Sequence, residues 1–448
     1  MTCLDRRSES DFKRRIFQYV DERADEMLRL VQNLVRVPSI SGTAHEGKAQ
    51  QLIIEELSRI HGIDLDVYEP DLGQVEQYPL HPIRTTAWTY KDRPNVVGVL
   101  RGIGGGRSLI LNGHIDVVSP EPIDNWTRDP WSGDVEGNRL YGRGSLDQKA
   151  GLVSALYAVK CVRDLGLKLK GDIVFESVTE EELGGGGCIA TVVKGYKADA
   201  AIVTDCFSGK GAILIGQGGS RFFRIRIRGR TQIASKQEEA PDAVRVAMKI
   251  YDALIMLQKR RASRLSGTNP EYERLVKEFS GSDKITTLTI GILRAGDWPS
   301  HVAGWAEMEG RIGFPPNESG NQVEREIEET ITTLSLDDPW MKYAAPVLKW
   351  VGARREGYLL DADEPIVQTV KDCIEVVTFA KAAVCATTVN SDASWLTPRV
   401  AGYGGIPTIL YAPGGANAHS ADEYVLIEDI IAVTKVLALT LCKWCRAG

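Results

Sequence analysis

The chain has 448 residues, of which 43% are hydrophobic and 25% are charged, a composition typical of globular proteins. This length predicts two domains, because single hydrophobic cores stop growing at about 250–300 residues. The net charge of −6, from 54 basic and 60 acidic residues, argues against a protein that coats nucleic acid, so no nucleic-acid partner is expected.

No apolar stretch approaches the roughly 20 residues that a membrane span needs, so we expect no membrane partner. The opening segment, MTCLDRRSESDFKRR, lacks the apolar core of a secretory signal. Eight cysteines are scattered without the rhythm of a disulfide scaffold, and most of them fall in apolar segments. Reduced, buried thiols and a cytoplasmic location are therefore expected.

The first predicted element is a long amphipathic helix at 11–36, which ends at Val37-Pro38. Short β-branched runs then alternate with helical segments, and this alternation predicts a mostly parallel sheet covered by helices. The expected elements of this part are strands at 95–101, 108–112, 172–178 and 200–204, and a helix at 149–165.

The pattern changes after Gly218. Residues 221–228 alternate apolar and basic side chains, as a strand with one exposed face does. We interpret the arginines as charges that prevent an edge strand from pairing with another chain, in preference to a phosphate-binding site. The order β-α-β-β-α that follows is typical of a compact two-layer unit. Its later elements are expected at 241–257, 284–293, 306–314 and 321–334.

The α/β pattern resumes near Lys349 and ends with a strand at 407–411 and a helix at 427–444. The predicted fold is therefore α/β, with a mostly parallel, helix-covered sheet in a main domain formed by 1–218 and 338–448. An α+β two-layer domain, 219–337, is inserted into it.

Histidine and acidic residues follow the predicted strands of the main domain. The carboxyl ends of strands in an open α/β sheet form the edge where ligands bind. Two histidines and several carboxylates at that edge are able to hold two divalent metals, with one carboxylate shared between them. In chain order these residues are His114 and Asp116, Asp147, the run Glu180, Glu181 and Glu182, then Asp205, and finally His419.

Four motifs contain these residues: GHIDVV at 113–118, GRGSLDQKAG at 142–151, TEEELGG at 179–185 and AHSADE at 418–423. Their order resembles that of the M20 metallopeptidase family, which includes zinc-dependent aminoacylases, deacylases and carboxypeptidases. The resemblance extends over nearly the whole chain. It implies two divalent ions, zinc or alternatively cobalt or manganese. It also implies a small amide or peptide substrate, and a homodimer formed through the inserted domain, which serves as a lid.

The resemblance also implies a role for each side chain. Hydrolysis of an amide would use Glu181 as the general base, which takes a proton from water and passes it to the leaving nitrogen. Asp116 would orient His114, and Glu180 would be a solvated or supporting residue. The implied metal ligands are His114 and Asp205 for one ion, Glu182 and His419 for the other, and Asp147 as the bridge.

The sequence departs from the family in the inserted domain. In GRTQIASKQEEAPDAV, Ile233 stands where the family has a histidine thought to stabilise the oxyanion, and Asp242 stands where asparagine is usual. Neither side chain donates a hydrogen bond in the way the family residues do. The inserted domain contains one histidine, His301. We interpret it as a surface residue in preference to a hydrogen-bond donor for the oxyanion. Arg311 is the candidate for binding a substrate carboxylate.

The predicted function is hydrolysis of an N-acyl amino acid or a related small amide. A dipeptidase or carboxypeptidase of the same fold is the nearest alternative, because the metal site does not distinguish an acyl group from an aminoacyl group. The departures at Ile233 and Asp242 leave three explanations open. The substitution is engineered to trap a substrate, or the subfamily uses another donor. Alternatively the chain belongs to a different class, namely an acyl-transfer or synthase enzyme, or a catalytically silent member of the family.

Overall fold

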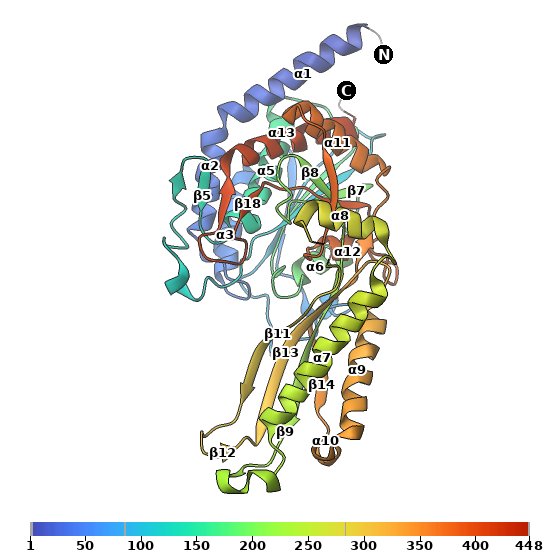
Figure 1. Cartoon of the computed structure of the whole chain (residues 1–448). Helices are drawn as coiled ribbons and strands as arrows, with labels where there is room; N and C mark the ends of the chain where they lie inside the picture. The colour runs from blue at the N-terminus through green and yellow to red at the C-terminus, as the bar shows by residue number, and fades with distance from the viewer. Residues whose placement is uncertain (1–2, 85–86, 283, 447–448) are drawn as a thin grey trace.

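The computed structural model describes residues 3–84, 87–282 and 284–446. A helix-covered main sheet forms one part of the molecule, and a four-stranded sheet with its own helices projects from it as an elongated arm (Figure 1). The predicted α/β fold class is confirmed. Within the described ranges, no helix is long and apolar enough to cross a membrane.

The main sheet has the strand order β1-β2-β6-β3-β7-β17-β8-β15, and β16 also pairs with β8. Its central strands β6, β3, β7 and β17 run parallel, while the outer pairs β1-β2, β2-β6 and β8-β15 are antiparallel. The central strands are apolar runs because helices cover both faces of the sheet. The strands are β1 (Ile63–Tyr68), β2 (Asn95–Leu100), β3 (Leu109–His114), β6 (Ile173–Val178), β7 (Ala200–Val203), β8 (Ala212–Gln217), β15 (Tyr358–Leu359), β16 (Ala383–Thr387) and β17 (Thr408–Leu410).

The main sheet divides the core of this part into two hydrophobic clusters, one on each face. Helix α5 is buried over almost its whole length, because it is packed against α13 as well as the sheet. The predicted single helix at 11–36 was wrong: Arg23, with φ −109° and ψ 9°, leaves the helical region and separates α1 from α2. The helices are α1 (Cys3–Glu22), α2 (Ala24–Val35), α3 (His45–Ser58), α4 (Leu72–Val75), α5 (Ala150–Asp164), α6 (Gly186–Lys194), α8 (Pro270–Ser280), α11 (Pro365–Thr378), α12 (Ala393–Leu396) and α13 (Ile427–Trp444).

The arm is an antiparallel sheet of order β11-β13-β9-β14, with α7 and α9 packed on it around a third hydrophobic cluster. Strand β14 lies beyond the predicted end of the inserted domain, and α8 packs against β16 of the main sheet. The boundaries 219–337 stay a prediction. The arm comprises β9 (Gly219–Arg228), β10 (Gln232–Ile233), α7 (Ala243–Leu265), β11 (Leu288–Ala295), β12 (His301–Val302), β13 (Trp305–Phe314), α9 (Gly320–Asp337), α10 (Pro339–Tyr343) and β14 (Val347–Arg355).

The alternation of β9 has a different cause from the one predicted. β9 is an inner strand between β13 and β14, so the interpretation as an edge strand was wrong. Its apolar side chains face the helices, and Arg224 and Arg226 on the other face pair with Glu307 and Glu309 of β13. Opposite charges on neighbouring strands therefore stabilise the open face of the arm.

Candidate metal centre

The parallel centre of the main sheet brings the predicted metal ligands to one edge. His114 is the last residue of β3, Glu182 follows β6, and Asp205 follows β7. Since β6, β3 and β7 are neighbours with the same direction, their carboxyl ends lie side by side. The loop after β17 carries His419 to the same place, where its Nε2 lies 3.1 Å from a Glu182 carboxylate oxygen.

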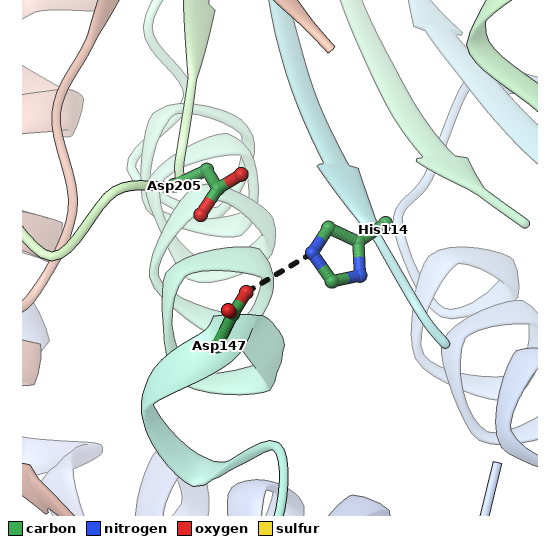
Figure 2. Close-up of side chains that lie close together, drawn as sticks. All are labelled: His114, Asp147 and Asp205. Atoms are coloured by element: carbon green, nitrogen blue, oxygen red, sulfur yellow. Dashed lines mark hydrogen bonds and ion pairs between the residues drawn. The ribbon is translucent and has the colours of Figure 1, made fainter. Parts of the chain in front are cut away.

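The first group of candidate ligands consists of His114, Asp147 and Asp205, all of them buried, with ligand atoms within 4.8 Å of one another. Figure 2 shows the three side chains converging, with His114 Nε2 3.2 Å from Asp147 Oδ1. Burial opposes protonation of the imidazole, but its hydrogen bond with Asp147 raises the pKa of His114 well above its ordinary value. The carboxylates of Asp147 and Asp205 therefore favour a positive charge in this pocket, whether on the imidazole or on a bound cation.

The second group consists of Asp147, Glu182 and His419. His419 Nε2 lies 3.0 Å from Asp147 Oδ2 and 3.1 Å from a Glu182 carboxylate oxygen. Burial raises the pKa of Glu182 to about 7, and the neighbouring charge of Asp147 adds to this effect. Burial works against a charged imidazole, but hydrogen bonds to the two carboxylates raise the pKa of His419 to about 11.

Asp147 belongs to both groups and presents a different oxygen to each. Oδ1 faces His114 and Oδ2 faces His419. Burial alone would raise its pKa, but the hydrogen bonds from the two histidines lower it. Imidazole nitrogens and carboxylate oxygens suit zinc and related divalent ions, and a buried set of three carboxylates needs cationic charge nearby. The donor set therefore fits two divalent ions that share Asp147.

The AHSADE motif positions the shared carboxylate through its glutamate. Glu423 accepts hydrogen bonds from the backbone N–H groups of Leu146 (2.9 Å) and Asp147 (3.1 Å), and it pairs with Arg143. A small antiparallel sheet holds the two segments together. Its strands are β4 (Val135–Glu136), β5 (Arg139–Tyr141), β18 (Gly415–Ala416) and β19 (Tyr424–Leu426).

The Asp116 carboxylate lies behind the acidic run. It accepts hydrogen bonds from the backbone N–H groups of Glu181 (3.1 Å) and Glu182 (3.2 Å). The backbone carbonyl of Asp116 is 2.8 Å from His114 Nδ1. Its carboxylate Oδ1 is also 3.5 Å from His114 Nδ1, so Asp116 contacts His114 through main chain and side chain, while its carboxylate also holds the two glutamates.

The three adjacent glutamates point to three different partners. Glu180, only 2% exposed and with a positive φ of 65°, pairs with Arg84 at 2.6 Å and contacts the Tyr90 hydroxyl. The solvated alternative for Glu180 was therefore wrong, and the supporting alternative agrees with its position. Glu182 faces His419, whereas Glu181 is directed toward Arg355.

Glu181 is buried beside the candidate ligands. Arg355 donates from Nη2 to Glu181 Oε1 at 2.6 Å and to the Glu181 backbone oxygen at 2.8 Å. Burial raises the pKa of Glu181, while the positive charges of Arg355 and His114 oppose the rise. A carboxyl group whose pKa is raised is a stronger base for taking a proton from water.

The glycines after Glu182 allow close packing. Gly185 has φ 77°, and a Cβ there would collide with the Trp395 indole. A Cβ on Gly186 would collide with the Tyr90 hydroxyl and with Glu180. These positions require glycine because α6 begins directly against neighbouring side chains.

Sequence reasoning missed Arg355 and Asp392. Arg355 is the last residue of β14, a strand that was not predicted, and no motif contains it. Asp392 is fully buried, and neither of its carboxylate oxygens has a hydrogen-bond partner among the described residues. Strand order gave no signal for Asp392, because β16 is parallel to β8 and therefore antiparallel to β17 and the other central strands, so a residue that follows it is expected at the opposite edge of the sheet.

Of the candidates in the arm, Arg311 lies at the junction with the main part. It donates to Asn390 Oδ1 at 2.8 Å and to Thr287 Oγ1 at 3.2 Å. Burial lowers the pKa of Arg311 to about 10, and the positive charge of Arg355 adds to this effect.

The other three arm candidates lie away from the cluster. Ile233 on β10 pairs with His301 on β12, and β12 lies at the far end of the arm (Figure 1). Asp242 accepts a hydrogen bond from Val244 N at 2.9 Å and caps α7. Within one chain, the structure does not bring these side chains to the candidate ligands.

The sequence profile described as Peptidase family M20/M25/M40 matches residues 110–443, three quarters of the chain. The chain belongs to this family. The N-formyl-4-amino-5-aminomethyl-2-methylpyrimidine deformylase of Halalkalibacterium halodurans is 28% identical, over 96% of this chain and 97% of the relative. A succinyl-diaminopimelate desuccinylase of Methylorubrum extorquens is 24% identical, over 92% of this chain and 97% of the relative.

Solved structures show the same M20 fold. A di-peptidase from Saccharomyces cerevisiae has a TM-score of 0.78 at 15% identity, and the match covers 97% of this chain and 99% of that one. A dinuclear metal-binding M20 peptidase from Bacillus subtilis has a TM-score of 0.60 at 14% identity, covering 95% and 99%. As an M20 member, the chain is a metal-dependent hydrolase that acts on amide C–N bonds.

Proposed function

We propose that this M20 hydrolase removes a small acyl group from an amine and uses two divalent ions held by ligand groups that share Asp147. The observation that carries the proposal is the position of the Asp147 carboxylate, with one oxygen toward His114 and the other toward His419. Zinc is the proposed ion, and cobalt and manganese are alternatives for the same donors.

The proposed ligands of one ion are His114, Asp147 and Asp205, and those of the other are Asp147, Glu182 and His419. The chemistry that bound divalent ions supply at such a site is polarisation of a carbonyl and a lowered pKa for water.

Glu181 is the proposed general base. It takes a proton from water while the water oxygen forms a bond to the carbonyl carbon and the C=O electron pair moves to the carbonyl oxygen. Glu181 then passes this proton to the nitrogen as the C–N bond breaks. The products are a carboxylic acid and an amine. Asp116 supports these steps, because it holds the backbone of Glu181 and Glu182 in place.

The proposed substrate is a small N-acyl amine. Similarity to a deformylase over nearly the full length of both chains supports a small acyl group such as formyl. Similarity to a desuccinylase supports the same reaction on a larger acyl group. Arg311 remains the candidate for binding an anionic group of the substrate, since it lies half-buried at the junction of the arm and the main part.

The proposal includes a homodimer formed through the arm and a cytoplasmic location. Strand β11 is an edge strand of the arm, and the exposed apolar side chains of Met248, Met256 and Leu293 support an interface on this part. The structure describes the side chains of seven of the eight cysteines, and all seven are buried and free, which supports a reducing compartment.

The test measures metal content and product formation together. The purified protein should hold two divalent ions per chain, and His114→Ala and His419→Ala should each lose an ion, because each removes a ligand of a different group. The wild-type protein should release acid and amine from a panel that runs from N-formyl to N-succinyl amines. Full metal occupancy in both variants would refute the site, and acyl transfer to an added amine in place of hydrolysis would refute the reaction.

A further inference from the structure

Amide hydrolysis places negative charge on the carbonyl oxygen of the substrate, and a positioned donor at that oxygen is one of the largest sources of rate enhancement. The donor must lie close to the general base, because both act on atoms attached to the same carbon. Glu181 is the proposed base, so the donor is to be found around its carboxylate.

Arg355 meets this requirement. Its Nη2 donates to Glu181 Oε1 at 2.6 Å and to the Glu181 backbone oxygen at 2.8 Å. The side chain is 9% exposed, and its guanidinium lies 5.8 Å from the centre of the Trp395 ring. Its Nε is buried and has no hydrogen-bond partner within the described ranges. The guanidinium is thus anchored through one nitrogen and retains further N–H groups for another oxygen.

We propose that Arg355 is a catalytic residue that donates to the carbonyl oxygen of the substrate as that oxygen becomes negative. This inference rests on the proposed function, since it assigns a residue to the same reaction. The donor is a guanidinium that the arm strand β14 delivers to the general base.

Charge transfer explains why one guanidinium can serve both groups. As water attacks, its proton moves to Glu181 and its oxygen bonds to the carbonyl carbon, so the carboxylate loses negative charge while the carbonyl oxygen gains it. Arg355 lies beside both groups. Its anionic partner is the Glu181 carboxylate before this step and the substrate oxygen after it. Its interaction with the substrate oxygen is stronger in the transition state than in the ground state, which is the condition for an increase in kcat.

Other donors of the arm are less well placed. Arg311 is already engaged by Asn390 and Thr287. His301 pairs with Ile233 at the far end of the arm.

Arg354 offers a matched control on the same strand. Its side chain contacts the Pro79 backbone oxygen and lies 3.6 Å from Glu324, whereas the contact with Glu181 is made by Arg355. Arg354→Gln therefore removes the same charge from β14 without touching the general base.

The experiment compares Arg355→Gln, Arg355→Lys and Arg354→Gln in the metal-loaded enzyme with an N-formyl amine as substrate. For Arg355→Gln we expect kcat to fall about a hundred- to a thousandfold, the usual loss of one oxyanion donor, with KM changed by less than about threefold. Arg355→Lys should retain part of the activity, and Arg354→Gln should retain nearly all of it. Metal content should be unchanged in all three.

A binding measurement gives a second readout. A phosphinate analogue that replaces the carbonyl with a tetrahedral centre should bind Arg355→Gln at least about tenfold more weakly than wild type, while formate, the product, binds both alike. An increase in KM with kcat unchanged, an equal loss for analogue and product, or a loss of metal from both Arg355 variants would overturn the inference. A wild-type enzyme with two ions and no turnover on any amide would instead refute the proposed function. In that case, weaker binding of the analogue by Arg355→Gln would still support Arg355 as the hydrogen-bond donor.

Discussion

The metal-ligand cluster and the tip of the arm were both singled out from sequence, yet they differ in how their side chains are held. His114, Glu182, Asp205 and His419 lie at or after the ends of parallel strands of the main sheet, whereas Asp147 follows β5 of the small antiparallel sheet and contacts both His114 and His419. At the tip, Ile233 is 53% exposed and belongs to a two-residue strand whose partner is β12. Residue roles carried over by resemblance are therefore best supported where the sheet itself brings the positions together.

A second contrast concerns charge. The cluster concentrates carboxylates in a buried space, where burial and the neighbouring charge of Asp147 raise the pKa values of Glu182 and Asp205. The charged side chains near the tip, such as Lys236 and Glu239, lie in solvent, where ion pairs contribute little. Substitutions in the cluster should consequently change chemistry or stability much more than those at the tip.

The largest effect is expected at Glu181. Glu181→Gln removes the proposed proton acceptor and no proposed metal ligand, so kcat should fall about a hundred- to ten-thousandfold while metal content stays close to wild type. Steady-state kinetics and metal analysis measure both quantities. Loss of metal in this variant would show that Glu181 is a metal ligand and not the general base. The matched comparison is Glu182→Gln, which should lose metal.

Glu180 should affect stability rather than chemistry. Glu180→Gln leaves the half-buried Arg84 without its carboxylate partner, and the cost of breaking a fully buried pair, about 3–5 kcal/mol, is the upper limit for this change. Chemical denaturation should show this loss in the free energy of unfolding, while kcat of the folded protein changes by less than about threefold. A drop in kcat as large as that of Glu181→Gln would contradict the distinct roles of these adjacent residues.

Glu176, on β6 beneath the cluster, should make stability depend on pH. Burial raises its pKa from 4.5 to about 7, against the opposing hydrogen bonds from Asn112 and Thr191. The folded state then holds a proton that the unfolded state releases above its own pKa, so the stabilisation is complete below about pH 4.5 and is lost as pH rises through about 7. The pKa difference corresponds to a decrease of about 3 kcal/mol in the free energy of unfolding of the wild type. Glu176→Gln does not titrate, so this decrease should be absent from the variant.

Urea unfolding of wild type and Glu176→Gln at pH 5 and pH 8 measures this effect. The variant should gain stability relative to wild type at pH 8 and not at pH 5. The same difference at both pH values would show that Glu176 does not titrate in this range.

The smallest effect is expected at the tip. Ile233→His places an imidazole on an exposed strand away from the cluster, so kcat/KM should change by less than about twofold and stability by less than about 0.5 kcal/mol. A gain of tenfold or more, measured on the same N-formyl substrate, would show that the tip reaches an active site, which in the proposed dimer would be that of the partner subunit.

Much of the fold could be read from local patterns. The short apolar runs at 95–101, 108–112, 172–178 and 200–204 appear as β2, β3, β6 and β7. They could be recognised because strands covered by helices on both faces bury side chains on both sides and are therefore apolar throughout. The helix 427–444 was also placed correctly. Strand β14 was missed because its residues resemble the start of the next α/β unit, and only pairing with β9 assigns it to the arm.

Local patterns were enough to select the residues able to hold metal, since the ligand chemistry and the order of strand, turn and acidic residue are local properties. Where each side chain points was decided by tertiary structure. Glu180, Glu181 and Glu182 are identical in chemistry and adjacent in the chain, yet they pair with Arg84, Arg355 and His419 respectively. These partners lie far from the acidic run in the sequence, so only the packing of the arm and the loops against the sheet edge distinguishes one carboxylate from the next.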